Sequence, residues 1–272
     1  VKANTLRDTL YFPRGTYLCN QAICLDGRIK VAGSGIGSTA ITRTSSATET
    51  IDGNSVVAVF YVTGGWNHIS DLDITGIGVS ASLHGIQFGY NIPAKGSIKN
   101  VAINNCLVGI SEKAGVFLTE ISNVQVVNCG TGFDFSSNNQ CTSLTFDCCY
   151  AANCGTAYTL KLVDYSNLTS CAADNCNWGS LPANPYGTGY GNPASAYGVY
   201  HLVQCSGVNL HNCGSEGSYG NGVVSVESSW ATIESLSVID CKSTYVPGSG
   251  AYAVGPIQGT TAANNVTILN PR

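Results

Sequence analysis

Charged residues are scarce in this 272-residue sequence: Asp, Glu, Lys and Arg together make up 10%, against about 25% in ordinary globular domains. Between Lys113 and Lys242 the only cation is Lys161. A surface so poor in Lys and Arg cannot neutralise a phosphate backbone or an anionic lipid surface, so we expect neither nucleic acid nor a membrane as partner. The composition favours a neutral or polar ligand.

Long apolar runs, methionine and long helix-forming stretches are also missing. The longest apolar run, residues 56–62, is seven residues, far short of the roughly 20 that span a bilayer. Residues 1–4 have no signal-peptide character and there is no initiator Met, so we expect a fragment of a longer protein. With 44% hydrophobic residues and 32 glycines, the chain is typical of one all-β domain with many tight turns over 1–272.

An Asn-Cys pair recurs at the end of short apolar segments. The copies are Asn105-Cys106, Asn128-Cys129, Asn153-Cys154, Asn175-Cys176, Asn212-Cys213 and the variant Asp240-Cys241, and most cysteines are separated by 22 to 28 residues. A fixed interval of this size indicates a solenoid built from repeated coils.

The residues before each pair indicate the type of solenoid. In residues 122–133 Val124 and Val126 share one face, and in 206–214 Val208 and Leu210 do the same. Period-two alternation with β-branched residues predicts strands, and a glycine-rich turn followed by another short strand completes each unit. The sequence therefore predicts a single-stranded parallel β-helix with coils stacked about 4.8 Å apart.

Thirteen cysteines would ordinarily indicate disulfides in a secreted chain. Six of them are predicted to occupy equivalent places in successive coils, where stacked thiols act as small apolar side chains. Their number is odd and stacked partners would pair promiscuously, so we expect reduced thiols in a protein assembled in cytoplasm. The spacings do not match a zinc site and His is scarce, so no metal or other cofactor is expected.

The segment 12–17 (Phe-Pro-Arg-Gly-Thr-Tyr), the segment 33–35 (Gly-Ser-Gly) and the Asn-Cys-Gly coil endings together resemble the pectate-lyase-like superfamily. In particular they resemble the right-handed parallel β-helix of bacteriophage tailspike proteins, with residues 1–55 as opening coils. This resemblance implies a homotrimer in the virion tail, assembled in the host cytoplasm beside other tail proteins and acting outside the bacterial cell. It also implies binding and hydrolysis of a bacterial surface polysaccharide by a pair of carboxylates.

One long step between cysteines reveals an insertion at residues 177–197, which contains no charged residue. Its aromatic rings would offer flat apolar faces with polar rims, which suit sugar rings. Contact with a neighbouring subunit would explain the same composition equally well. Residues predicted to bind substrate here and on the adjacent coils are Trp178, Tyr186, Tyr190, His201 and Lys161.

Catalytic acids must point outward, and the strand alternation selects them. Asp134 lies between Phe133 and Phe135, and the coil register predicts Asp134, Lys161 and His201 in one outward column. The pair is predicted to come from four acids in the half of the solenoid that borders the insertion: Asp134, Asp164, Glu216 and Glu227. Asp174 lies in the same half, and Asp71 with Asp73 forms a further outward pair whose simpler explanation is an exposed polar strand face.

Two other functions stay open. One is a polysaccharide lyase, which needs a basic residue near the abstracted proton and, in the resembled family, acids that hold calcium. The middle coils have only Lys161 as a cation, so the sequence favours a hydrolase over a lyase. A virion spike or fibre that only binds its receptor would need the same stacking residues, so these residues do not distinguish binding from catalysis.

Overall fold

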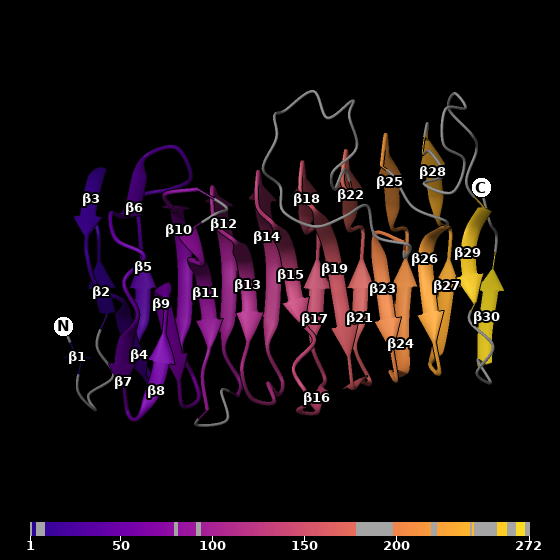
Figure 1. Cartoon of the computed structure of the whole chain (residues 1–272), viewed down its shortest axis with the longest axis horizontal. Helices are drawn as coiled ribbons and strands as arrows, with labels where there is room; N and C mark the ends of the chain where they lie inside the picture. The colour runs from indigo at the N-terminus through magenta and orange to yellow at the C-terminus, as the bar shows by residue number, and fades with distance from the viewer. Residues whose placement is uncertain are drawn as a thin grey trace.

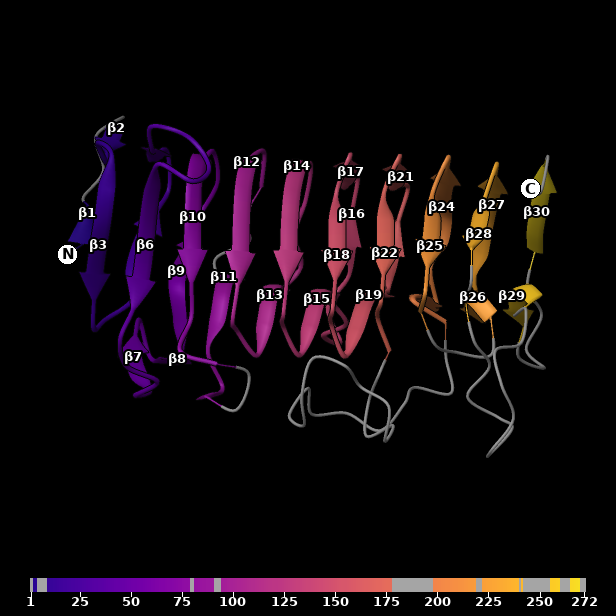
Figure 2. The same ribbon diagram turned by 90° about the horizontal axis from the view of Figure 1, so that it is seen from above.

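The structure is a computed structural model that describes residues 2–3, 9–78, 81–90, 94–177, 198–218, 222–239, 241, 255–259 and 265–269. The chain winds into an elongated solenoid whose coils stack along one axis, with the two ends of the chain at opposite ends (Figures 1 and 2). Every pairing between successive coils is parallel, and the described residues contain no α-helix. The predicted parallel β-helix is confirmed. No helix among these residues is long and apolar enough to cross a membrane.

One side of the solenoid is sheet A, to which each coil contributes one strand. It runs along the front of the molecule in Figure 1 and along the lower side in Figure 2. In spatial order its strands are β1 (Lys2–Ala3), β4 (Ile23–Asp26), β9 (Ala58–Thr63), β11 (His84–Phe88), β13 (Val108–Glu112), β15 (Thr131–Phe135), β19 (Thr156–Lys161), β23 (Tyr200–Val203), β26 (Gly222–Glu227) and β29 (Gly255–Gly259).

Sheet B forms the remaining sides of each coil, because its strands bend or break halfway. Its strands are β2 (Thr9–Tyr11), β3 (Gly15–Cys19), β5 (Lys30–Ala32), β6 (Thr39–Arg43), β10 (His68–Thr75), β12 (Ser97–Asn104), β14 (Glu120–Val127), β16 (Cys141–Thr142), β17 (Thr145–Asp147), β18 (Tyr150–Ala152), β20 (Val163–Asp164), β21 (Asn167–Thr169), β22 (Ala172–Asp174), β24 (Ser206–His211), β25 (Gly214–Glu216), β27 (Trp230–Glu234), β28 (Ser237–Ile239) and β30 (Asn265–Leu269).

The core lies inside the coils, where equivalent residues stack on one another. Val124 and Val126 on β14 and Val208 and Leu210 on β24 are buried, as the alternation predicts. Phe133, Tyr158 and Tyr200 occupy one inward row of sheet A, and their rings stack with centroids 4.7 and 4.9 Å apart. Each tyrosine hydroxyl donates to main-chain carbonyls, for example Tyr200 to Cys171 at 2.8 Å, so no hydroxyl in this stack is left unpaired.

Each coil turns at three corners, and at each corner one residue adopts a left-handed backbone conformation. The Asn corner, between sheet B and sheet A, has Asn105, Asn128, Asn153 and Asn175, with φ between 48° and 56°. Asn tolerates this conformation better than most residues do, so the recurring asparagine follows from the backbone. The middle corner, within sheet B, has Asp71, Asn100, Asn123, Cys148, Ser170 and Asn212. The lower corner, where sheet A passes into sheet B, has Trp66, Lys95, Leu118, Ser143 and Tyr165.

The thiols do stack, but in more than one column. Cys154, Cys176 and Cys241 each lie against the equivalent main-chain carbonyl of the preceding coil at the Asn corner. Cys213 is the exception to the predicted ladder, because it lies at the middle corner with Cys149 and Cys171. Its expected place is taken by Ser218, whose hydroxyl accepts from the Cys176 main-chain N–H across 42 residues.

The coil that follows Cys176 therefore extends past Cys213. It returns to the Asn corner at Ser218, whose hydroxyl contacts the main chain at Cys176 and Ala173. Of the predicted insertion at residues 177–197, only Asn177 lies within the described residues. All thirteen cysteines are free thiols.

An antiparallel hairpin, β7 (Glu49–Ile51) with β8 (Asn54–Val56), interrupts the opening coils, which the sequence did not predict. It is held by Arg43, which is 0% exposed and pairs with Glu49 at 2.6 Å. The Arg43 guanidinium also donates to three main-chain carbonyls in this segment, so it fixes the path of the chain before the hairpin.

Candidate functional site

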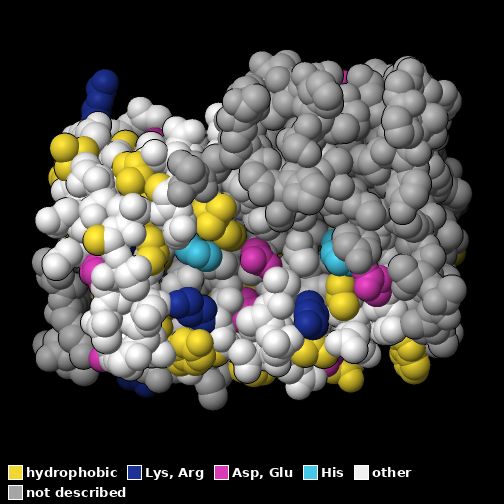
Figure 3. Space-filling model, in the orientation of Figure 1, with side chains coloured by type: hydrophobic (Ala, Val, Ile, Leu, Met, Phe, Trp, Pro, Cys, Tyr) yellow, Lys and Arg dark blue, Asp and Glu magenta, His cyan; other side chains and the backbone are white. Residues whose placement is uncertain are grey.

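The outward face of sheet A has one continuous row of equivalent side chains. Strand register aligns Cys24, Tyr61, Gln87, Ser111, Asp134, Thr159, His201 and Ser225 in successive coils. Figure 3 shows acidic, basic and histidine side chains close together across the middle of this face. Only three successive members of this row are partly exposed, on strands about 4.8 Å apart: Asp134, Thr159 and His201,. The other five are buried: Cys24, Tyr61, Gln87, Ser111 and Ser225.

Glu112 is the most perturbed acid on this side of the molecule. It ends β13 and is 6% exposed, and its two carboxylate oxygens accept from the Ser137 main-chain N–H at 2.7 Å and from the Ser137 hydroxyl at 2.6 Å. Burial raises the pKa of Glu112 to about 7, against the opposing effect of the Ser137 hydrogen bonds and with a smaller contribution from the nearby Asp134 charge. A carboxyl group of this kind holds a proton in part of the population at neutral pH.

Asp134 lies on the adjacent strand β15, in register with Ser111, the neighbour of Glu112. One strand spacing and one residue along the strand place the two Cα atoms about 6 Å apart. Asp134 is half-buried and accepts from the Ser136 hydroxyl at 2.5 Å. Burial raises its pKa as well, and the Ser136 hydrogen bond opposes that shift. The two acids lie on adjacent strands in unequal environments: Glu112 is at an inward, buried position and Asp134 at an outward, partly exposed one, and the Asp134 charge adds a small part of the rise in the Glu112 pKa.

Histidines flank this acid pair. On one side His84 Nδ1 lies 2.7 Å from the Ser111 hydroxyl, and burial, followed by the Lys113 charge, lowers the pKa of His84 to about 4. On the other side His201 Nε2 lies 2.6 Å from Glu227 Oε1. The neutral His84 imidazole and the Ser111 hydroxyl can both donate to and accept from sugar hydroxyls.

The predicted column of Asp134, Lys161 and His201 exists in part. Asp134 and His201 share the outward row, with Thr159 between them. Lys161 lies two residues further along its strand, in the next outward row, where the register leads through Val203 to Glu227. Its ammonium group donates to Asn138 at 2.7 Å. The structure thus places Asp134, Lys161, His201 and Glu227 on one face.

The other predicted acids lie elsewhere. Asp164, on β20, lies past the turn that leaves sheet A and accepts from the Gln140 side-chain amide at 2.5 Å. Glu216 is exposed on β25 in sheet B, next to Asp174, which accepts from the Glu216 main-chain N–H at 2.9 Å. Trp178, Tyr186 and Tyr190 lie outside the described residues.

The two acids of β10 do not act as a pair. Asp71 is at the middle corner and accepts from Asn100 at 2.9 Å, whereas Asp73 accepts from the Gly37 main-chain N–H at 2.7 Å. Each carboxylate therefore fixes a separate turn, in line with the structural explanation.

Sequence reasoning missed Glu112, because it considered only acids at outward positions. Glu112 occupies the strand position that is Phe88 in the preceding coil and corresponds to Phe135 in the next one, where the alternation predicts an apolar residue. Aligning residues 84–88, 108–112 and 131–135 would have revealed an acid in an apolar column. A charged residue in such a place is rare without a partner, and it marks a candidate functional site.

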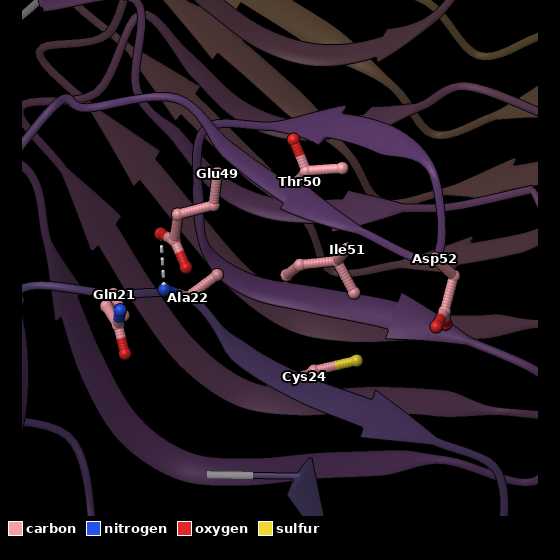
Figure 4. A pocket seen from close by; sticks show the side chains of 7 residues that line it. All are labelled: Gln21, Ala22, Cys24, Glu49, Thr50, Ile51 and Asp52. Atoms are coloured by element: carbon pink, nitrogen blue, oxygen red, sulfur yellow. Dashed lines mark hydrogen bonds between the residues drawn. The ribbon is translucent and has the colours of Figure 1, made fainter.

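An open cavity of about 280 Å³ lies at the N-terminal end of the same face, between β4 and the hairpin, and is lined by Gln21, Ala22, Cys24, Glu49, Thr50, Ile51 and Asp52. Figure 4 shows Glu49 reaching back to the Ala22 main chain, to which its Oε1 atom is hydrogen-bonded at 2.8 Å. That oxygen also pairs with Arg43. The carboxylate therefore serves the attachment of the hairpin, and the acid pair of sheet A is the better candidate for chemistry.

Among the described residues, no group of three or more His, Cys, Asp or Glu side chains is placed to hold a metal ion.

Comparison with solved structures identifies the architecture. The tailspike gp42 of Acinetobacter phage vb_AbaP_AS12 matches 89% of this chain with a TM-score of 0.69 and 16% sequence identity. WceF of Pantoea stewartii, described as a glycan biofilm modifying enzyme with a tailspike-like parallel β-helix fold, matches 89% of the chain with a TM-score of 0.56 and 12% identity. An alginate lyase from Paenibacillus sp. str. FPU-7 matches 98% with a TM-score of 0.58 and 11% identity.

The fold is thus a right-handed parallel β-helix, as the sequence resemblance implied. It is shared by phage tailspikes and by polysaccharide-active enzymes. The chain spans 42% of the tailspike chain, 34% of WceF and 94% of the alginate lyase. No family model matches the sequence, and no curated protein matches it.

Proposed function

We propose that this protein binds a bacterial surface polysaccharide along sheet A and hydrolyses it with Glu112 and Asp134. The observation that carries the proposal is the raised pKa of Glu112, about 7 and caused by burial, beside a second carboxyl group on the adjacent strand. Glycoside hydrolysis needs one carboxyl that holds a proton near neutral pH and one that is ionised. Glu112 is the proton donor, and Asp134 activates water or attacks the sugar.

The surroundings of the pair support a sugar ligand. His84, Ser111, Lys161 and His201 lie within two coils of the pair and offer polar donors and acceptors, of which Lys161 is a cation. The shared fold of tailspikes and glycan-modifying enzymes agrees with this substrate class. By the same analogy we propose that the chain forms part of a homotrimeric virion tail protein that works at the outer surface of the bacterial cell beside other tail proteins.

The test is incubation of the protein with purified capsular and O-antigen polysaccharides, followed by measurement of new reducing ends and of the size of the products. Glu112→Gln and Asp134→Asn are each expected to lower the rate at least 100-fold, because each removes a proton-transfer group. Glu120→Gln is the matched control: Glu120 is an exposed acid on sheet B that pairs with Lys99, and its loss should leave the rate unchanged.

Three further variants, Asp164→Asn, Glu216→Gln and Glu227→Gln, test the other predicted acids in the same assay. A full loss of activity in one of them, with activity retained in Glu112→Gln, would move the catalytic pair to that residue. Both reactions release new reducing ends, so an absorbing C=C bond at the non-reducing end of the products would identify a lyase.

A specific observation favours a second function, which is binding without cleavage. Both oxygens of Glu112 are already bonded to Ser137, and this arrangement also suits a purely structural role that fixes the turn after β15. Retention of the polysaccharide by the protein, with an unchanged polymer length, would establish the binding function.

A further inference from the structure

The lower corner of the solenoid has large exposed side chains where the backbone favours other residues. Trp66, Leu118 and Tyr165 have φ of 66°, 51° and 48° and are 51%, 53% and 73% exposed. A left-handed conformation costs a residue of this size roughly 1–2 kcal/mol, and a side chain that is half or more exposed recovers only part of what full burial would contribute. The Asn corner solves the same backbone problem with asparagine, so folding does not explain these three residues.

These side chains follow a regular interval along the solenoid. The main-chain N–H of each corner residue donates to the carbonyl that lies one residue before the corner position of the next coil. This relation runs through Trp66, Lys95, Leu118, Ser143, Tyr165 and Gly207. Trp66, Leu118 and Tyr165 are therefore in every second coil, about 10 Å apart. Trp230, 59% exposed, pairs with Ser206 and continues the interval two coils beyond Tyr165. We call Trp66, Leu118, Tyr165 and Trp230 the corner ridge.

The residues between the ridge members contact the exposed rings. The Lys95 ammonium group lies over one face of the Trp66 ring, 5.0 Å from its centre, and fixes the ring by a cation–π contact, so a ligand would use the other face,. In the coil after Tyr165 the corner position is Gly207, with φ 70°. A Cβ atom there would contact the Tyr165 ring at 3.4 Å, so only glycine leaves that part of the ring uncovered.

A protein surface or a chain of sugar rings could bind such a ridge, and the shape of the ridge favours the sugar chain. The core of a protein interface is a contiguous, close-packed patch of several hundred Å². The ridge is a single file of separated side chains on a convex edge, and Figure 3 shows hydrophobic side chains at intervals along the lower edge of the molecule. A chain of sugar rings meets isolated apolar faces one at a time, and the interval is comparable with the repeat of two sugar units in an extended chain.

We infer that the corner ridge is a second glycan-binding site, which holds an extended stretch of the polysaccharide parallel to the solenoid axis. The inference rests on the proposed function for the class of ligand, but it does not depend on the catalytic acids. The ridge binds by stacking of sugar rings, and sheet A contacts the segment that is cleaved.

The experiment uses the full chain carrying Glu112→Gln, so that polymers stay intact, and a panel of neutral capsular and O-antigen polysaccharides plus hydroxyethyl cellulose. Binding is followed by tryptophan fluorescence and affinity electrophoresis. Trp66→Ala and Tyr165→Ala should each weaken binding of a polymer roughly fivefold, the equivalent of a stacking contact of about 1 kcal/mol. Tyr11→Ala is the matched control, since Tyr11 is an aromatic residue of similar exposure on β2.

The outcomes are distinct. Unchanged polymer affinity in both ridge variants, or no polymer in the panel that binds, overturns the ridge. A change of sedimenting mass in the ridge variants also overturns it and makes this corner an interface between copies. Weakened polymer binding by the ridge variants upholds the ridge even if Glu112→Gln and Asp134→Asn still cleave, in which case the catalytic proposal alone fails.

Discussion

Replacing Glu112 with glutamine separates two opposing effects of pH on the stability of the β-helix. Burial raises the pKa of Glu112 from 4.5 to about 7, so between these pH values the folded chain keeps a proton that the unfolded chain has released. The free energy of unfolding therefore falls as pH rises through this interval. At about 1.4 kcal/mol per pH unit the loss is about 3 kcal/mol.

His84 changes the free energy of unfolding with pH in the opposite direction. Burial, helped by the Lys113 charge, lowers the pKa of His84 from 6.5 to about 4, so between these values the unfolded chain binds a proton that the folded chain does not. The free energy of unfolding rises with pH over this interval, again by about 3 kcal/mol. In the unmodified protein the two effects largely cancel where the intervals overlap.

The assay is equilibrium urea unfolding, with unfolding and refolding limbs, at pH values that cover both intervals. Relative to the unmodified protein, Glu112→Gln should gain about 3 kcal/mol between the lower and the upper limit of the Glu112 interval, because glutamine mimics the protonated acid. His84→Gln should show the reverse trend over its own interval. If the difference between Glu112→Gln and the unmodified protein stays constant within about 0.5 kcal/mol across both intervals, the buried-acid explanation is refuted.

Three structural predictions accompany this one. Arg43→Ala should lower the free energy of unfolding by about 3–5 kcal/mol, since it leaves Glu49 without its ion-pair partner,. Hydrogen exchange should then speed up most in residues 44–57. An equal increase in exchange over the whole chain would contradict the role of Arg43. Asn128→Ala should lower the free energy of unfolding by about 1 kcal/mol in urea unfolding, because alanine is strained at the φ of 55° that Asn128 adopts,. Asn128→Gly should cost less, because glycine adopts this φ without strain. Equal costs would refute the backbone explanation for asparagine. Tyr158→Phe keeps the ring stack but loses the hydroxyl hydrogen bonds to the Cys149 and Ala172 carbonyls, which should lower the free energy of unfolding by about 1 kcal/mol. Tyr158→Ala removes the ring as well and should cost about 3–5 kcal/mol. Similar urea midpoints for the two variants would show that ring packing contributes little.

The coil architecture could be predicted because its constraints repeat. An inward valine or leucine is needed at every second strand position, and an asparagine is favoured wherever the backbone turns left-handed, so each coil signals the same structure. The error at Cys213 has a physical cause: Asn212 also occupies a left-handed position, but at the middle corner. One Asn-Cys pair therefore looks the same at two corners, and only the pairing between coils distinguishes them.

The site was harder to predict because it depends on departures from the repeat. Asp134 and His201 were found by alternation and do share a row. Glu112 was missed because its position is an inward one, and only the reach of its side chain to Ser137 in the next coil makes an acid tolerable there. The hairpin of β7 and β8 could not be foreseen either, since it depends on the buried Arg43 guanidinium, which binds the main-chain carbonyls of Ser45, Ala47 and Ala58 on either side of the hairpin.

The stacked thiols have a consequence for how the molecule responds to an oxidising medium. Eleven of the thirteen cysteines are buried, and burial raises the pKa of Cys141 to about 12 and that of Cys205 to about 11. Since the thiolate is the reactive species, the Cys141 and Cys205 thiols are almost inert while the coils are intact. Once a coil opens in an oxidising medium, neighbouring sulfurs at the corners become free to form mismatched bridges, so such a medium would hinder refolding.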